Sequence, residues 1–279
     1  LSYAAAGQLE SLELYRGIAP VSVAQESIGG AIAVTTNRGS FTQDKAFKMS
    51  GNLIANGQSA NNGSHLNAAL YLANDTHRLK LGAMTESASD AEFPNGEITP
   101  NEYERQRYDL GYGFQSDRHT MQLDYTYSDT GDTGTAALPM DIKYIEGDLY
   151  SVGYTFAAAE DINIEAKVYG AKLDHGMTNY HLRDAPPAAR WRRNIAGTDN
   201  FGFEIQTKIE DGQGSWLLGF DHFESDHDSD IDNPNNPMFF VTNFNGAERQ
   251  VTGVFVERAH HINDHWRAEL GLRYNQVNM

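Results

Sequence analysis

Two residues in the second half of the chain have side chains that could bind a soft metal ion. His175 and Met177 stand two positions apart, just after a segment, 162–173, in which apolar and polar residues alternate. Because side chains two apart on a strand leave the same face, the imidazole and the thioether would lie together. Such a pair suits copper, especially Cu(I), better than ions that prefer oxygen ligands. From spacing alone, a His and a Met that only pack or hydrogen-bond are the commoner case.

A second candidate for metal binding is the acidic segment 221–232, DHFESDHDSDID. Its carboxylates could hold Ca²⁺ through oxygen ligands. The segment lacks the ligand spacing and the bidentate glutamate of an EF-hand loop, and acidic loops are more often simply hydrated. Calcium is therefore the weaker of the two metal hypotheses.

The composition argues against several other classes of function. The 279 residues include no cysteine, so neither disulfides nor a thiolate metal site can form from them. The formal charge of −17 argues against a nucleic-acid partner, which requires a basic surface. No nucleophile elbow, phosphate-binding glycine loop or HExxH motif occurs. We therefore predict that the protein is not an enzyme and has no cofactor.

The elements that must position His175 and Met177 are about eleven short strands after residue 40. They are expected at 46–55, 66–73, 78–85, 103–115, 119–128, 148–156, 162–173, 198–209, 215–224, 248–260 and 265–277. Tight turns and long polar loops alternate between them, which is typical of an antiparallel up-and-down barrel with short turns at one mouth. No run of 18 apolar residues occurs, which excludes a transmembrane helix.

Apolar and polar residues alternate along the expected strands, as they would in a wall between lipid and a polar lumen. In 119–129, one face carries Met121, Leu123, Tyr125 and Tyr127, and the other carries polar residues. Outer-membrane barrels have this pattern, with aromatic girdles on the lipid side, although a soluble sandwich alternates in the same way. If the wall is a barrel, His175 and Met177 share the polar face of 162–173 and should point into the lumen.

A stretch near the N-terminus carries a resemblance to a known family. Residues 9–39, LESLELYRGIAPVSVAQESIGGAIAVTTNRG, read as two short strands joined by a glycine-rich connection. The stretch is similar to the end of the plug domain of TonB-dependent outer-membrane receptors. The resemblance implies an all-β fold in which 1–40 closes an α+β plug domain and 41–279 forms the first half of a transmembrane barrel of about 22 strands. The chain is then expected to be a fragment, cut at both ends.

Within that family the chain most resembles the copper receptors. The similarity lies in DHGMTNYHLR at 174–183, LPMD at 138–141 and LSY at 1–3. In those receptors the His and Met of the strand bind copper together with a plug Cys and Met that lie before the SY. The resemblance therefore assigns copper binding to His175 and Met177 only, and the plug ligands would precede Leu1.

The function that the resemblance implies is energy-coupled uptake of a scarce ligand across a Gram-negative outer membrane, with copper as the favoured ligand. Its expected partners are outer-membrane lipid and the inner-membrane TonB complex. One alternative is a receptor for a ferric siderophore or another organic ligand. The aromatic and basic residues Trp191, Arg192 and Arg193 slightly favour this alternative. The other is a soluble or surface β-rich adhesion module without a transport role.

Overall fold

The computed structural model describes residues 6–23, 25 and 29–279 as two antiparallel sheets and one short hairpin. A 3-10 turn, η1 (Ala6–Gln8), leads into the small sheet, β1 (Leu9–Arg16) and β2 (Gly30–Thr36). Eleven strands form the large sheet, which we call the wall: β3 (Lys48–Gln58), β4 (Gly63–Ala73), β5 (His77–Ala88), β8 (Tyr103–Gln115), β9 (His119–Thr130), β10 (Asp141–Ala159), β11 (Ile162–Thr178), β12 (Arg193–Glu210), β13 (Gly214–Asp232), β14 (Phe240–Asn263) and β15 (Trp266–Asn278). The short hairpin β6 (Ala91–Phe93) and β7 (Gly96–Ile98) and the 3-10 turn η2 (Ala188–Arg190) lie in its connections. No helix of the described residues is long and apolar enough to cross a membrane.

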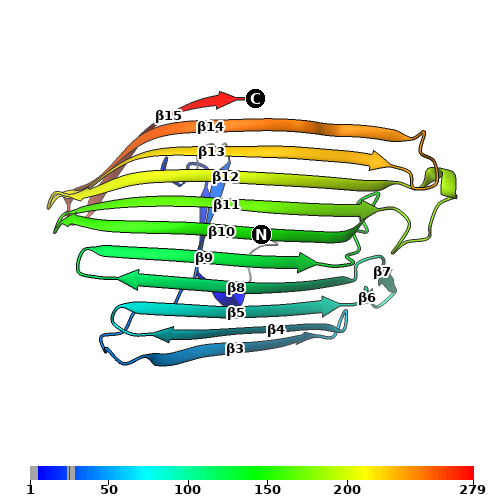
Figure 1. Cartoon of the computed structure of the whole chain (residues 1–279), viewed down its shortest axis with the longest axis horizontal. Helices are drawn as coiled ribbons and strands as arrows, with labels where there is room; N and C mark the ends of the chain where they lie inside the picture. The colour runs from blue at the N-terminus through cyan, green and yellow to red at the C-terminus, as the bar shows by residue number, and fades with distance from the viewer. Residues whose placement is uncertain (1–5, 24, 26–28) are drawn as a thin grey trace.

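The strands of the wall follow one another in chain order, each antiparallel to the next, so the predicted up-and-down topology is confirmed. Figure 1 shows the strands as one curved layer, with β3 and β15 at its two edges. The connections sort by length: 74–76, 116–118, 160–161, 211–213 and 264–265 are tight turns at one end. The connections at the other end include the long loops 89–102, 131–140, 179–192 and 233–239. Eleven strands were expected, and the wall has eleven.

The small sheet lies against one face of the wall, behind the strands in the view of Figure 1. We call β1, β2 and the described residues that flank and join them, within 6–39, the inner hairpin. Its Gln8 donates to Asn67 of β4, and its Arg38 forms an ion pair of 2.8 Å with Asp124 of β9. These contacts define the inner face of the wall.

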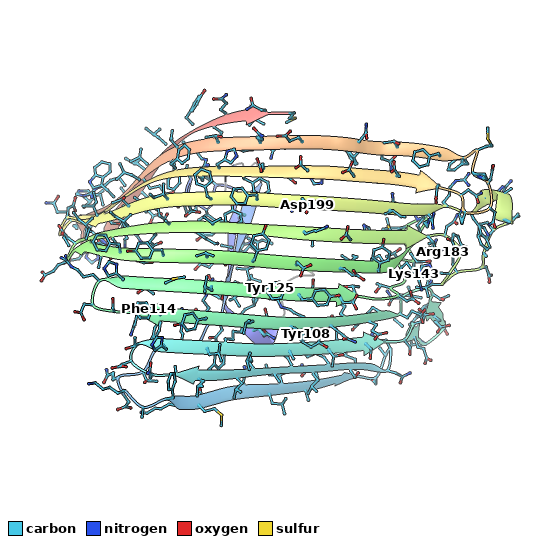
Figure 2. The ribbon with its side chains drawn as sticks, viewed as in Figure 1. Tyr108, Phe114, Tyr125, Lys143, Arg183 and Asp199 are labelled. Carbon is cyan, nitrogen blue, oxygen red and sulfur yellow. The ribbon has the colours of Figure 1, made fainter. Side chains whose placement is uncertain are left out.

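The outer face of the wall carries a continuous apolar belt. Large side chains that are more than a third exposed occur on it from β3 to β15, among them Leu53, Leu70, Leu81, Leu110, Met121, Val152, Val168, Ile205, Leu218, Val254 and Leu272. Figure 2 shows Tyr108 and Tyr125 on this face, and they are 51% and 43% exposed. A soluble protein rarely exposes so large an apolar surface, whereas a lipid-facing barrel wall requires it.

Ile205 tests the lipid-facing assignment, because it lies near the middle of the roughly ten residues of β12 that would cross the hydrocarbon layer. Ile205→Arg should destabilise the folded protein in lipid vesicles by about 2–4 kcal/mol, since a lipid-facing charge at mid-depth is costly. The matched control is Gln206→Arg at the next position, which faces inward beside Glu165 and should change the stability little. Equal destabilisation by both variants in denaturant titrations would contradict the assignment.

Several strands are longer than the sequence predicts, mostly at the end with long loops, although β10 and β14 also gain three residues at the tight-turn end. The predicted loop 174–197 is wrong at both ends, because β11 continues to Thr178 and β12 begins at Arg193. The predicted loop 225–247 is wrong in the same way, because β13 continues to Asp232. The residues added to β13, 225–232, are polar on both faces except for Ile231, as expected where a strand rises out of the membrane into water on either side.

Candidate metal site

His175 and Met177 both lie on β11, and the structure places them on the inner face of the wall. The pairing of β11 with β12 runs without a register shift from Ile162 to Thr178, so odd-numbered residues share one face. Lys167 and Tyr169 on that face line a cavity beside the inner hairpin. The prediction that His175 and Met177 point inward therefore agrees with the register of the sheet.

The neighbours of the pair leave the imidazole without a structural partner. His175 stands opposite Ile145 and Ala196 on the adjoining strands, and Met177 stands opposite Ile142 and Asn194. Neither Ile145 nor Ala196 has a side chain that can hydrogen-bond. The Nε2 atom of His175 is buried, and no group in the described part of the chain hydrogen-bonds to it. A buried polar atom without a partner is unusual in a native protein, and a bound ion or water molecule would account for it.

The same spacing occurs once more in the wall, at His119 and Met121 of β9. These side chains face outward, where Met121 is 37% exposed. There the Nδ1 atom of His119 hydrogen-bonds with the hydroxyl of Tyr154 at 2.7 Å, and its ring stacks on Phe156. Spacing alone thus does not distinguish the two pairs, and only the pair at His175 and Met177 combines an inward direction with a free ring nitrogen.

The loops beyond the pair are fastened by Arg183 and Asp141, which sequence reasoning did not select. Arg183 donates from Nε and Nη2 to the two carboxylate oxygens of Asp141, both at 2.6 Å, and from Nη1 to the carbonyl of Leu138. The backbone N–H of Thr135 also donates to Asp141. The loop 131–140 is thereby tied to the loop 179–192.

Asp141 is the first residue of β10. It lies outside the roughly ten residues of that strand that would cross a membrane, in the region of the long loops. Burial alone would raise the pKa of Asp141, but the hydrogen bonds from Arg183 and from the Thr135 N–H outweigh it and lower the pKa. The contribution of this contact to stability is therefore present above the ordinary aspartate pKa and is lost as pH falls through the lowered value. Thr178 and His181 add a further bond of 2.5 Å that ends β11.

The acidic segment 221–232 is strand rather than loop, and its carboxylates do not converge. Asp221 faces inward, whereas Glu224, Asp226 and Asp228 take alternate positions on the outer face of β13. Among residues 6–23, 25 and 29–279, no three His, Asp or Glu side chains are placed so that they could hold one ion. The calcium hypothesis gains nothing from this arrangement.

Comparison with known proteins identifies the family to which the chain belongs. A family model described as "TonB dependent receptor-like, beta-barrel" matches residues 35–279, most of the chain. The chain belongs to the TonB-dependent receptor family. No curated protein sequence matches the chain.

Solved structures of TonB-dependent receptors share the fold of this one. The structure titled "Copper transporter OprC" is 15% identical with a TM-score of 0.83, covering 99% of this chain and 43% of that one. The siderophore receptor PiuA from Acinetobacter baumannii is 14% identical, with a TM-score of 0.67 and coverage of 97% and 47%. The ferric yersiniabactin receptor FyuA from Yersinia pestis is 13% identical, with a TM-score of 0.61 and coverage of 95% and 51%. The chain thus spans about half the length of these proteins.

Family membership confirms several sequence-based predictions at once. TonB-dependent receptors are outer-membrane proteins of Gram-negative bacteria, and they are transport proteins rather than enzymes. The all-β class and the barrel wall are confirmed, and the adhesion-module alternative finds no support. Residues 1–3 of the resemblance to copper receptors lie outside the described residues.

Proposed function

We propose that this receptor takes up copper across the outer membrane, with His175 and Met177 as two of the ligands. Residues 1–40 would be the end of the plug domain and 41–279 the first half of the barrel. The inner-membrane TonB complex would supply the energy by acting on the plug. The observation that carries the copper assignment is the buried Nε2 atom of His175, which has no partner in the described residues and shares a face with Met177.

The chemistry of the pair favours copper over harder ions. A thioether sulfur is a soft ligand and an imidazole nitrogen is a borderline one that also binds copper, so together they favour copper, especially Cu(I), among the first-row metals. Two ligands do not complete a site, so the proposal requires further soft ligands from the plug. The copper transporter OprC, which shares this fold at 15% identity, is consistent with the proposal without deciding it.

A ferric siderophore is the second candidate, because siderophore receptors also share the fold, with TM-scores of 0.67 and 0.61. The aromatic and basic residues that would favour it are largely engaged with one another. Tyr180 stacks on Trp191 at 4.3 Å, and the guanidinium of Arg192 lies 3.7 Å from the ring centre of Phe239. These contacts hold the loops 179–192 and 233–239 together, which leaves less of this surface for an organic ligand.

Metal titration of the purified receptor in detergent separates the two candidates. Under anaerobic conditions, with a chromophoric Cu(I) chelator as competitor, we expect one Cu(I) ion to bind tightly per receptor. Ferric enterobactin, as a representative catecholate complex, should not quench the tryptophan fluorescence at micromolar concentration. Tight binding of the ferric complex without binding of Cu(I) would overturn the copper proposal in favour of the siderophore alternative.

A further inference from the structure

A cavity of about 650 Å³ lies between the inner hairpin and the wall, at the middle height of the sheet. The hairpin lines it with Leu9, 34–36 and Arg38, and the wall lines it with residues from β5 to β13. Cavities of this size accommodate small organic molecules. Four of its charged side chains lie on neighbouring strands: Lys80 on β5, Arg107 and Asp109 on β8, and Asp124 on β9.

Lys80 is the unusual member of this group. Its side chain faces the cavity and is only 3% exposed, and among the described residues its Nζ atom has no hydrogen-bond partner. A buried ammonium group is costly unless it is paired. The side chain therefore needs an acceptor that the described residues do not supply.

The two nearest carboxylates are already bound to other cations. Asp109 accepts hydrogen bonds from Nε and Nη2 of Arg107 at 3.0 and 2.7 Å, and another from the hydroxyl of Thr126 at 2.7 Å. Asp124 accepts from Arg38 at 2.8 Å. Arg38, Lys80 and Arg107 thus stand beside only two carboxylates, both of which are bonded to the arginines. This end of the cavity therefore carries a surplus positive charge in a chain of net charge −17.

Arg107 offers a second unused donor at the same place. It is 7% exposed, and its Nη1 atom is buried without a hydrogen-bond partner in the described part of the chain. Space beside Lys80 is kept open by Gly111, where a Cβ atom would lie 3.4 Å from Cβ of Lys80 and 3.2 Å from Oδ1 of Asp124. Two buried cationic donors therefore border the same polar end of the cavity.

We propose that this cavity binds a small oxyanion, a carboxylate or phosphate group, through Nζ of Lys80 and Nη1 of Arg107. Hydrogen bonds between cationic donors and anionic oxygens are among the strongest in proteins, and a guanidinium suits both carboxylate and phosphate. Lys80 is the fourth residue of β5 from the tight-turn end, whereas His175 lies near the long-loop end of β11. The oxyanion site is therefore separate from the proposed copper ligands and does not depend on them.

Calorimetric titration of the purified receptor in detergent tests the site with two probes, citrate and inorganic phosphate. The wild type should bind at least one of them, and whichever binds identifies the class of oxyanion. Lys80→Met, which keeps the length of the side chain without its charge, should weaken that binding by roughly tenfold to a hundredfold, as expected for a hydrogen bond to a charged group. Lys80→Arg should retain most of it.

The matched control is Lys172→Met, which removes an exposed, outward lysine of β11 and should leave the affinity for the anion unchanged. Anion binding should also raise the unfolding temperature of the wild type but not of Lys80→Met. If Lys80→Met fails to fold, Lys80→Gln provides the same comparison. The proposal is overturned if the wild type binds neither probe at millimolar concentration, or if the folded Lys80 variants without the charge bind as tightly as the wild type.

Discussion

Replacing both His175 and Met177 with alanine should abolish tight Cu(I) binding by the receptor, weakening it by more than roughly a hundredfold. The size of the effect follows from the role proposed for both residues, since loss of even an outer-shell partner of a metal ligand costs about 10 to 100-fold. Each single variant should lose part of the affinity, with His175→Ala the larger loss because imidazole is the stronger ligand. The measurement is the anaerobic competition titration described above.

The matched control is the double variant His119→Ala with Met121→Ala, which removes the same residue types at the same spacing from the outer face of β9. His119 is engaged with Tyr154 and Phe156, so this pair should leave Cu(I) affinity unchanged. An unchanged affinity in the His175 and Met177 variant would refute the metal assignment. Equal losses in both double variants would point to a general loss of folding instead.

The fold could be predicted from the sequence because lipid and water impose opposite demands on alternate residues. In β9 the outward set Met121, Leu123, Tyr125 and Tyr127 and the inward polar residues take the faces that their alternation indicates. The largest boundary errors lie where that contrast disappears, although β10 and β14 also run three residues further than predicted at the tight-turn end. Beyond the membrane, as in 225–232, both faces of a strand meet water, so a strand there has the composition of a loop.

The candidate site was only partly predictable, because the alternation of side chains along a strand gives the direction of a side chain but not its partners. It places Lys80 and His175 on the inner face, yet it cannot tell that neither finds an acceptor there. That depends on which carboxylates are taken by other cations, and on the apolar residues Ile145 and Ala196 beside His175. Asp221 was considered as part of an acidic segment, whereas its actual partner, Arg273, lies 52 positions away.

Arg273 and Asp221 hold the inner hairpin to the last strands of the wall. Nη2 of Arg273 donates to both oxygens of Asp221, at 2.5 and 2.7 Å, and the two side chains are 7% and 8% exposed. Each partner also binds the hairpin: Arg273 donates from Nη1 to the carbonyl of Val21, and Asp221 accepts from the side-chain amide of Gln25. The pair therefore connects β13 and β15 with the segment that joins β1 to β2.

Arg273→Ala should destabilise this connection by about 3–5 kcal/mol, because it leaves the buried carboxylate of Asp221 without its cation. Hydrogen exchange should accelerate at Val21 and Ser22, while the amides of β4 beside Gln8 keep their protection because that contact is untouched. The matched control is Arg267→Ala on the same strand, whose partner Glu269 is exposed, so its loss should cost less than about 1 kcal/mol. Unchanged exchange at Val21 and Ser22 in the Arg273 variant would mean that other contacts hold this segment, such as the hydrogen bond from the Ser22 N–H to Glu257, and that the buried pair only joins β13 to β15.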